Sequence, residues 1–167
     1  MNDTEPHQRA TAAALRFLSH RPRSKEEVRT RLRRSFPADV VDRVIDDLTE
    51  RSLVDDSSFA KLWRDSRDSF NPRSATAIKR ELISKGVAGD LAQSTVDDLD
   101  DMDSAYRAGL KHARRLERAD LSTYRRRLWG YLQRRGFSSS VTRQTIARLL
   151  DERRGGGRSA SCEDEDH

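Results

Sequence analysis

Apolar residues recur along this chain at the spacing of short amphipathic helices. The segment 72–99 reads PRSATAIKRELISKGVAGDLAQSTVDDL, and its first apolar positions are Ala75, Ile78 and Leu82. Apolar residues three and four positions apart share one face of a helix, and glycine is the commonest residue just after a helix end. The segment therefore predicts a helix, a turn at Gly86 and a second helix.

Related segments lie about fifty residues to either side of this one. Pro-Arg-Ser begins at Pro22 and again at Pro72, and Gly86 and Gly136 share the same offset. Hydrophobic residues make up 34% of the chain and charged residues 37%, which argues against one large core. Self-similarity at a fixed period is typical of repeat proteins, whose modules gain stability by stacking on their neighbours. We therefore predict an all-α fold, a tandem array of three three-helix repeats that is elongated and curved.

The pattern also predicts where the repeats begin and end. We expect a flexible lead-in at residues 1–9, three-helix repeats at 10–54, 55–102 and 103–152, and a disordered tail at 153–167. The tail is rich in Gly and Ser and then acidic, a composition that buries too little apolar surface to fold alone.

Capping signals mark the helix ends. Ser24 and Glu27 have the S-x-x-E spacing of a capping box. Gly86 and Gly136 each follow a leucine by four positions and precede an apolar residue, the spacing of a Schellman motif. Ser35 occupies the corresponding turn of the first repeat, so we expect that turn to differ.

Positive charge is concentrated in the last repeat. The formal net charge of the chain is +5 and its pI about 9.8, yet residues 106–154 hold fourteen Lys and Arg against four Asp and Glu. A single arginine is most simply a solvated helix residue, but ten unbalanced charges in one repeat repel each other and favour a binding surface. Helix geometry does not require all of them to share a face. The candidate residues for binding a partner or DNA are Lys111, Arg114, Arg115, Arg118, Arg125, Arg126, Arg127, Arg134 and Arg135.

No motif for catalysis or cofactor binding accompanies this charge. The sequence contains no P-loop, G-x-G-x-x-G, H-E-x-x-H or C-x-x-C, so we expect a non-enzymatic protein without cofactor or metal. Cys162 is the only cysteine and there is no apolar run of membrane-spanning length, so we expect a cytoplasmic protein. Asp55 and Asp56 are better explained as a helix N-cap than as a metal site. Trp63 and Trp129 lie at core spacing and are expected to pack rather than to stack on bases.

Four motifs in order resemble the RecX family of regulatory proteins. They are AAALRFLSHRPRS, LVDDSSFA, RELISKGV and LQRRGFS, within residues 10–151. The resemblance implies tandem three-helix repeats. It also implies a regulator that binds the RecA recombinase filament on DNA, lies in its groove and modulates its ATPase and strand-exchange activity, with inhibition as the expected direction. The process regulated would be recombination and DNA repair.

The charge pattern leaves a second function open. The basic repeat could meet acidic RecA surface or make non-specific contacts with DNA phosphates, and the protein is expected to be a monomer. The alternative is a general helical-repeat DNA-binding protein that acts without RecA, favoured by the positive charge and the helix-turn-helix form of each repeat. No set of base-reading side chains stands out, so sequence-specific binding is not predicted.

Overall fold

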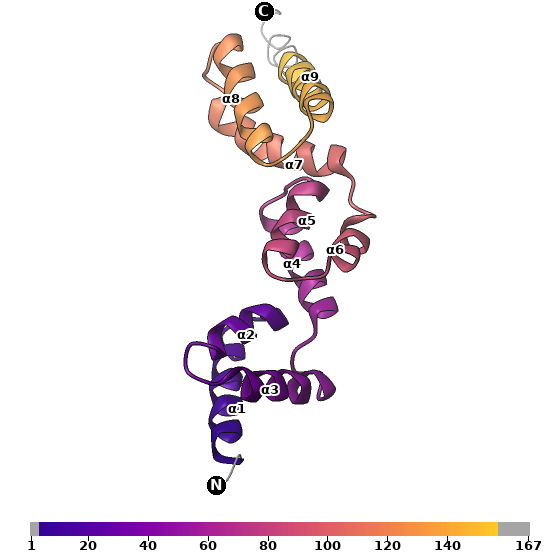
Figure 1. Cartoon of the computed structure of the whole chain (residues 1–167). Coiled ribbons are helices and arrows are strands. Elements are labelled where there is room, and N and C mark those ends of the chain that lie inside the picture. Colours follow the sequence, from indigo (N-terminus) through magenta and orange to yellow (C-terminus); the bar gives the residue numbers. More distant parts are fainter. Residues whose placement is uncertain (1–3, 157–167) are drawn as a thin grey trace, which may run out of the picture. The chain divides into compact units, whose positions relative to one another are not determined.

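The computed structural model describes residues 4–156, which form nine α-helices and one short 3-10 turn, with no strand in that range (Figure 1). The prediction of an all-α fold is therefore confirmed. Contacts divide the described chain into two compact units. Unit 1 holds residues up to 65 together with 79–97, and unit 2 holds residues 66–78 together with those from 98 onward.

The division falls within the predicted middle repeat. Helices α4 (Asp56–Phe70) and α5 (Ala75–Ser84) each contribute to both units, and α6 (Gly89–Val96) belongs to unit 1. The predicted repeat boundaries and the elongated, curved shape stay predictions, since each unit is described by itself.

Unit 1 is built around α1 (Thr4–Leu18), α2 (Lys25–Leu32) and α3 (Ala38–Glu50), which pack on one another. Small residues of α1, Ala10 and Ala14, are fully buried against the valines and leucines of α2 and α3. Residues 4–9, expected in a flexible lead-in, belong to α1. His7 Nε2 lies 2.9 Å from Asp47 Oδ2 of α3, which gives the first turn of α1 a partner that sequence periodicity does not reveal.

Unit 2 is built around α7 (Asp101–Ala113), α8 (Leu121–Arg134) and α9 (Ser139–Gly156), with the turn η1 (Arg114–Leu116) after α7. Leu128, Leu132 and Phe137 are buried between them. Because α9 continues to Gly156, the first residues of the expected tail, 153–156, are helical. The rest of that predicted tail lies outside the described residues.

The predicted helix ends are confirmed. The Ser24 hydroxyl accepts from Glu27 N and the Glu27 carboxylate accepts from Ser24 N, both at 3.1 Å. Gly86 and Gly136 have φ of 84° and 87°, and the amide after each glycine donates to the carbonyl of the leucine four positions before that glycine. In the first repeat the Ser35 amide donates to Leu32 O without a left-handed residue, so that turn differs as expected.

Each glycine turn also packs against the capped helix start of the preceding repeat. In unit 1 the Ser24 hydroxyl donates to Lys85 O at 2.5 Å, and in unit 2 the Ser74 amide donates to Arg135 O at 3.1 Å. A Cβ on Gly136 would lie 2.7 Å from Ser74 Oγ, closer than real side chains come. These two junctions, one in each unit, are the repeating contact of the fold.

A carboxylate reinforces each junction. Asp56 Oδ1 accepts from the amide of Lys25, and Asp101 Oδ1 accepts from the amide of Ala75, both at 2.8 Å. The adjacent Asp55 carboxylate caps α4 by accepting from the Ser58 hydroxyl and from the amides of Ser58 and Ser57, and these hydrogen bonds lower the pKa of Asp55. Asp55 thus caps α4, as the N-cap interpretation predicts, whereas Asp56 binds the start of α2 instead.

Candidate partner-binding surfaces in the basic repeat

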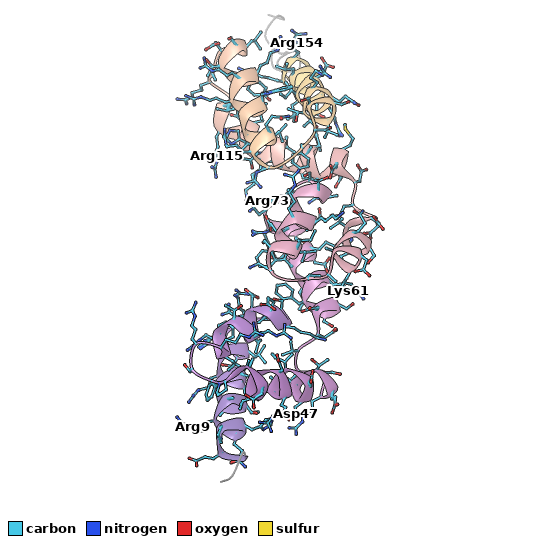
Figure 2. The ribbon with its side chains drawn as sticks, viewed as in Figure 1. Arg9, Asp47, Lys61, Arg73, Arg115 and Arg154 are labelled. Carbon is cyan, nitrogen blue, oxygen red and sulfur yellow. The ribbon has the colours of Figure 1, made fainter. Side chains whose placement is uncertain are left out.

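The nine candidate residues all lie in unit 2, in or next to α7, η1 and α8. Eight of them are exposed, and Arg135 is half-buried. They do not form one patch. Figure 2 shows Arg154 near the upper end of this unit and Arg115 well below it, so positive charge is spread along the unit rather than gathered at one point.

Helix geometry separates the arginines of α8. Side chains four or seven positions apart point the same way, whereas neighbours differ by about 100°. Arg127 and Arg134 are seven apart and share one side of α8. Arg125 shares the opposite side with Trp129, four positions later. Tyr124, Leu128 and Leu132 fill the buried direction between these two sides.

The first surface, which we call the junction cluster, consists of Lys111, Arg115, Arg127, Arg134 and Arg135 around His112. The His112 ring stacks on Tyr131 with centroids 4.0 Å apart and planes 5° from parallel. Burial lowers the pKa of His112, and the positive charges of Arg115, Arg134, Arg135 and Arg127 lower it further. The positive charges of these four arginines thus act on one imidazole.

A small recess of about 160 Å³ opens within the junction cluster. Lys111, Arg115 and Arg135 line it together with Phe70, a residue that is 79% exposed. Cations beside an exposed aromatic ring can contact phosphates and a stacked base at once. The sequence interpretation assigned no role to Phe70. Its position beside these cations depends on the packing of α4 against α7 in this unit, which no local sequence pattern reveals.

Arg135 has a structural role within this cluster. Its guanidinium donates to Pro72 O at 2.9 Å and to Asn71 Oδ1, and it lies 4.5 Å from the centre of the Tyr131 ring. Its own carbonyl accepts the Ser74 amide. Arg135 therefore holds the unit 2 junction together, and only part of its side chain is accessible.

The second surface, which we call the α8/α9 groove, lies on the other side of α8. It has a volume of about 780 Å³. Its floor is apolar, formed by Leu121, Trp129, Ile146 and Leu150, and four arginines border it. These are Arg125, Arg126, Arg143 and Arg154.

Trp129 departs from part of its prediction. Expected to pack in the core or between repeats rather than to stack on bases, it is 36% exposed and lines the α8/α9 groove, so it is not a core residue. Trp63 does pack as predicted: it lies against Phe59 with centroids 5.9 Å apart, and its Nε1 donates to Glu81 at 2.8 Å. The spacing Leu121, Arg125, Trp129 was the available signal, because it places an aliphatic, a cation and an aromatic residue on one side of α8.

The two remaining candidates belong to neither surface. Arg114 borders a recess of about 210 Å³ that also contains Glu117 and Glu152, so acidic groups offset its charge. Arg118 is exposed in the segment between η1 and α8. No contact within the described chain joins Arg118 to the other cations.

Several basic residues of the last repeat are used inside unit 2. Arg107 binds Asp68 at 2.6 Å and Asp103 at 2.7 Å, and these hydrogen bonds raise the pKa of Arg107 against the opposing effect of burial. Arg148 pairs with Glu152. Arg153 donates to the carbonyls of Glu117 and Ala119. The charge available to a partner is therefore smaller than the sequence count and is concentrated in the two surfaces.

Across residues 4–156 no cluster of three or more His, Cys, Asp or Glu side chains could hold a metal ion. Over the same residues, none of the helices combines the length and the apolar character needed to cross a bilayer.

The fold and these surfaces define a helical-repeat protein whose last repeat carries exposed cations. Two family models match the chain: the first three-helix domain of RecX over residues 10–48 and the third three-helix domain over residues 99–146. The regulatory protein RecX of Chlorobium limicola is 35% identical over 142 residues, covering 84% of this chain and 89% of that protein. That of Corynebacterium efficiens is 37% identical over 149 residues, covering 84% and 71%. The chain belongs to the RecX family of regulatory proteins.

Solved structures agree on the fold. RecX from Lactobacillus salivarius superposes with a TM-score of 0.73 at 22% identity, covering 89% of this chain and 98% of that one. A second regulatory protein RecX superposes with a TM-score of 0.71 at 20% identity, covering 85% and 72%. At these identities the match concerns the arrangement of the helices and not the side chains of the two surfaces.

Proposed function

We propose that this protein binds the RecA recombinase filament on DNA and inhibits its ATPase and strand-exchange activity without catalysing a reaction. Membership of the RecX family of regulatory proteins is the observation that carries the proposal. The two cation-bearing surfaces support it, since a filament on DNA presents phosphates and acidic side chains. On this proposal the protein acts in the cytoplasm, as a monomer, in the regulation of recombination and DNA repair.

The junction cluster is the better candidate for the nucleic-acid contact. Its cations surround a recess with an exposed aromatic ring, whereas the α8/α9 groove has a broad apolar floor suited to a protein segment. Arginine binds phosphate through two parallel hydrogen bonds, which suits Arg115, Arg127 and Arg134 to backbone contacts.

Titration of RecA ATP hydrolysis on single-stranded DNA tests the proposed function. The protein should slow hydrolysis when it is present at far fewer copies than RecA, because one bound regulator affects a continuous filament. An unchanged rate at equal concentrations of the two proteins would overturn the proposal. The same titration with RecA assembled beforehand separates an effect on assembly from one on the filament.

The alternative function is helical-repeat DNA binding that needs no RecA, and the junction cluster is the observation that favours it. Affinity from phosphate contacts falls steeply as salt rises, because each contact releases counterions. A salt titration of DNA binding, with and without RecA, distinguishes the two functions. The proposed function expects RecA to raise the affinity and flatten the salt dependence, whereas the alternative expects RecA to change neither.

A further inference from the structure

The four arginines of the α8/α9 groove lack acidic partners within residues 4–156. Ten residues line the groove and none of them is Asp or Glu. Arg125, Arg126, Arg143 and Arg154 form no ion pair with a carboxylate of the described chain, in contrast to Arg107 and Arg148 of the same unit. Cations gathered over an apolar floor repel one another unless an anion offsets them.

The same chain carries a matching anion. Residues 163–166 are four consecutive acids, Glu163, Asp164, Glu165 and Asp166. They come seven residues and more after the end of α9, the helix that supplies Arg143 and Arg154 to the groove. The four carboxylates of the segment equal in number the four guanidinium groups of the groove. Arginine–carboxylate pairs form charge-assisted, often bidentate hydrogen bonds.

The acidic segment is long enough to reach the two arginines that α9 contributes to the groove. Along α9, Arg154 lies eleven residues after Arg143, which at about 1.5 Å per residue is roughly 16 Å. Glu163 follows Gly156 by seven residues, and an extended chain spans up to about 3.5 Å per residue, or roughly 24 Å. Folding back along the groove therefore requires no change in α9.

We propose that residues 163–166 bind the α8/α9 groove of their own chain and compete there with acidic partners. Covalent attachment favours this occupant, because a ligand joined to its site through a short linker has an effective concentration in the millimolar range. Weak ion pairs can then fill the groove while a tighter or more abundant acidic partner can still displace the segment. This inference does not depend on the proposed function, since it concerns a contact within one chain.

Cys162 makes the contact directly measurable. It is the only cysteine and immediately precedes Glu163, so a nitroxide attached to it places a paramagnetic probe beside the acids of the full-length chain. In a ¹⁵N-labelled sample, the indole signal of Trp129 and the guanidinium signals of Arg143 and Arg154 should lose most of their intensity. The intensities should return when salt rises from about 0.1 M to about 1 M, which shortens the screening length from about 10 Å to about 3 Å.

Two matched variants of the full-length chain complete the test. Neutralising the segment (Glu163→Gln, Asp164→Asn, Glu165→Gln and Asp166→Asn) should restore the Trp129 signal, and so should Arg143→Gln with Arg154→Gln. Equal broadening of Trp129 in the native and neutralised chains would overturn the proposal. Broadening in a mixture of nitroxide-labelled unenriched chain with unlabelled ¹⁵N chain would also overturn it, because the occupant would then be a second copy. None of these samples contains RecA or DNA, so the outcome is separate from that of the ATPase titration.

Discussion

Gly86 and Gly136 each end a helix and also form the surface on which the preceding repeat packs. The left-handed backbone at both positions excludes most side chains, since a Cβ there costs about 1–2 kcal/mol. The second constraint is steric. A Cβ on Gly86 would lie 2.3 Å from Glu26 Cβ, and one on Gly136 would lie 2.8 Å from Ala77 Cβ. Neither atom can swing away, so the repeat would have to shift.

Substituting Gly136 tests both constraints together. Gly136→Ala should lower the free energy of unfolding by roughly 2–4 kcal/mol, since the left-handed backbone and overpacking each cost about 1–3 kcal/mol. Gly89→Ala is the matched control, because a Cβ there meets nothing within 4 Å. Denaturant unfolding of the two variants makes the comparison. Equal stability would show that the Gly136 turn tolerates an L side chain.

His112 reports on the charges of the junction cluster. Its pKa is lowered by burial against Tyr131 and then by Arg115 and other arginines, so the folded chain binds this proton less tightly than the unfolded chain does. The contribution of His112 to stability is therefore complete above about pH 6.5 and declines as the pH falls from there toward the folded pKa.

Titration of the His112 ring by NMR should give a pKa below the ordinary value of about 6.5. Arg115→Gln should raise that pKa by removing a nearby positive charge, while leaving it below 6.5, because burial is the larger cause. An unchanged pKa in Arg115→Gln would contradict the action of this charge on His112. Arg33→Gln, at an exposed position of the first repeat, serves as the control for loss of one positive charge.

At the scale of the element, the capping signals predict where helices end but not what else the caps touch. The Ser24 capping box and both Schellman turns follow from local spacing, so sequence alone predicts them. The hydrogen bonds from Ser24 to Lys85 and from Ala75 to Asp101 span 61 and 26 residues. No local pattern encodes such contacts, because they depend on how repeats meet.

Asp56 shows how one carboxylate can fix a helix start in the preceding repeat. Asp56→Ala leaves the amide of Lys25 without its acceptor and should lower the free energy of unfolding by about 1–2 kcal/mol. Asp56→Asn keeps an acceptor oxygen and should lower the free energy of unfolding by less than Asp56→Ala does. Asp46→Ala, on the exposed side of α3, should change stability by less than about 0.5 kcal/mol. Thermal unfolding of the three variants tests this predicted order of stabilities. Equal losses of stability in Asp56→Ala and Asp46→Ala would contradict it.

The sequence predicts which repeat carries the candidate site but not which side chains share one surface. Composition places the charge in the last repeat, and all nine candidates lie there. Which cations are available depends on partners distant in sequence, as when Asn71 and Pro72 engage Arg135. Arg143 and Arg154 join the α8/α9 groove only because α9 packs beside α8. Sequence reasoning could count these arginines but had no means to assign them to a surface.

At the scale of the whole molecule, the last repeat offers two surfaces of unequal availability. If the acidic segment occupies the α8/α9 groove, the junction cluster is the surface that remains available to bind a polyanion. Arg127 and Arg134 are its exposed members on α8, and neither side chain forms a hydrogen bond or an ion pair within the described chain. Arg135 is unsuitable for testing this function, because its substitution would also loosen the unit 2 junction.

Charge reversal can therefore separate the two surfaces. Arg127→Glu with Arg134→Glu should raise the amount of protein needed to inhibit RecA ATP hydrolysis by roughly tenfold, equivalent to about 1.4 kcal/mol of binding free energy. Arg125→Glu with Arg126→Glu should have a smaller effect, since the acidic segment already offsets part of the charge of the groove. Arg33→Glu with Arg34→Glu makes the same change of charge on exposed arginines of the first repeat and should have little effect. All three double variants should unfold within a few degrees of the native chain, because exposed substitutions change stability by only about 0.5 kcal/mol. If the first-repeat pair weakens inhibition as much as the Arg127 and Arg134 pair, net charge rather than the junction cluster governs binding.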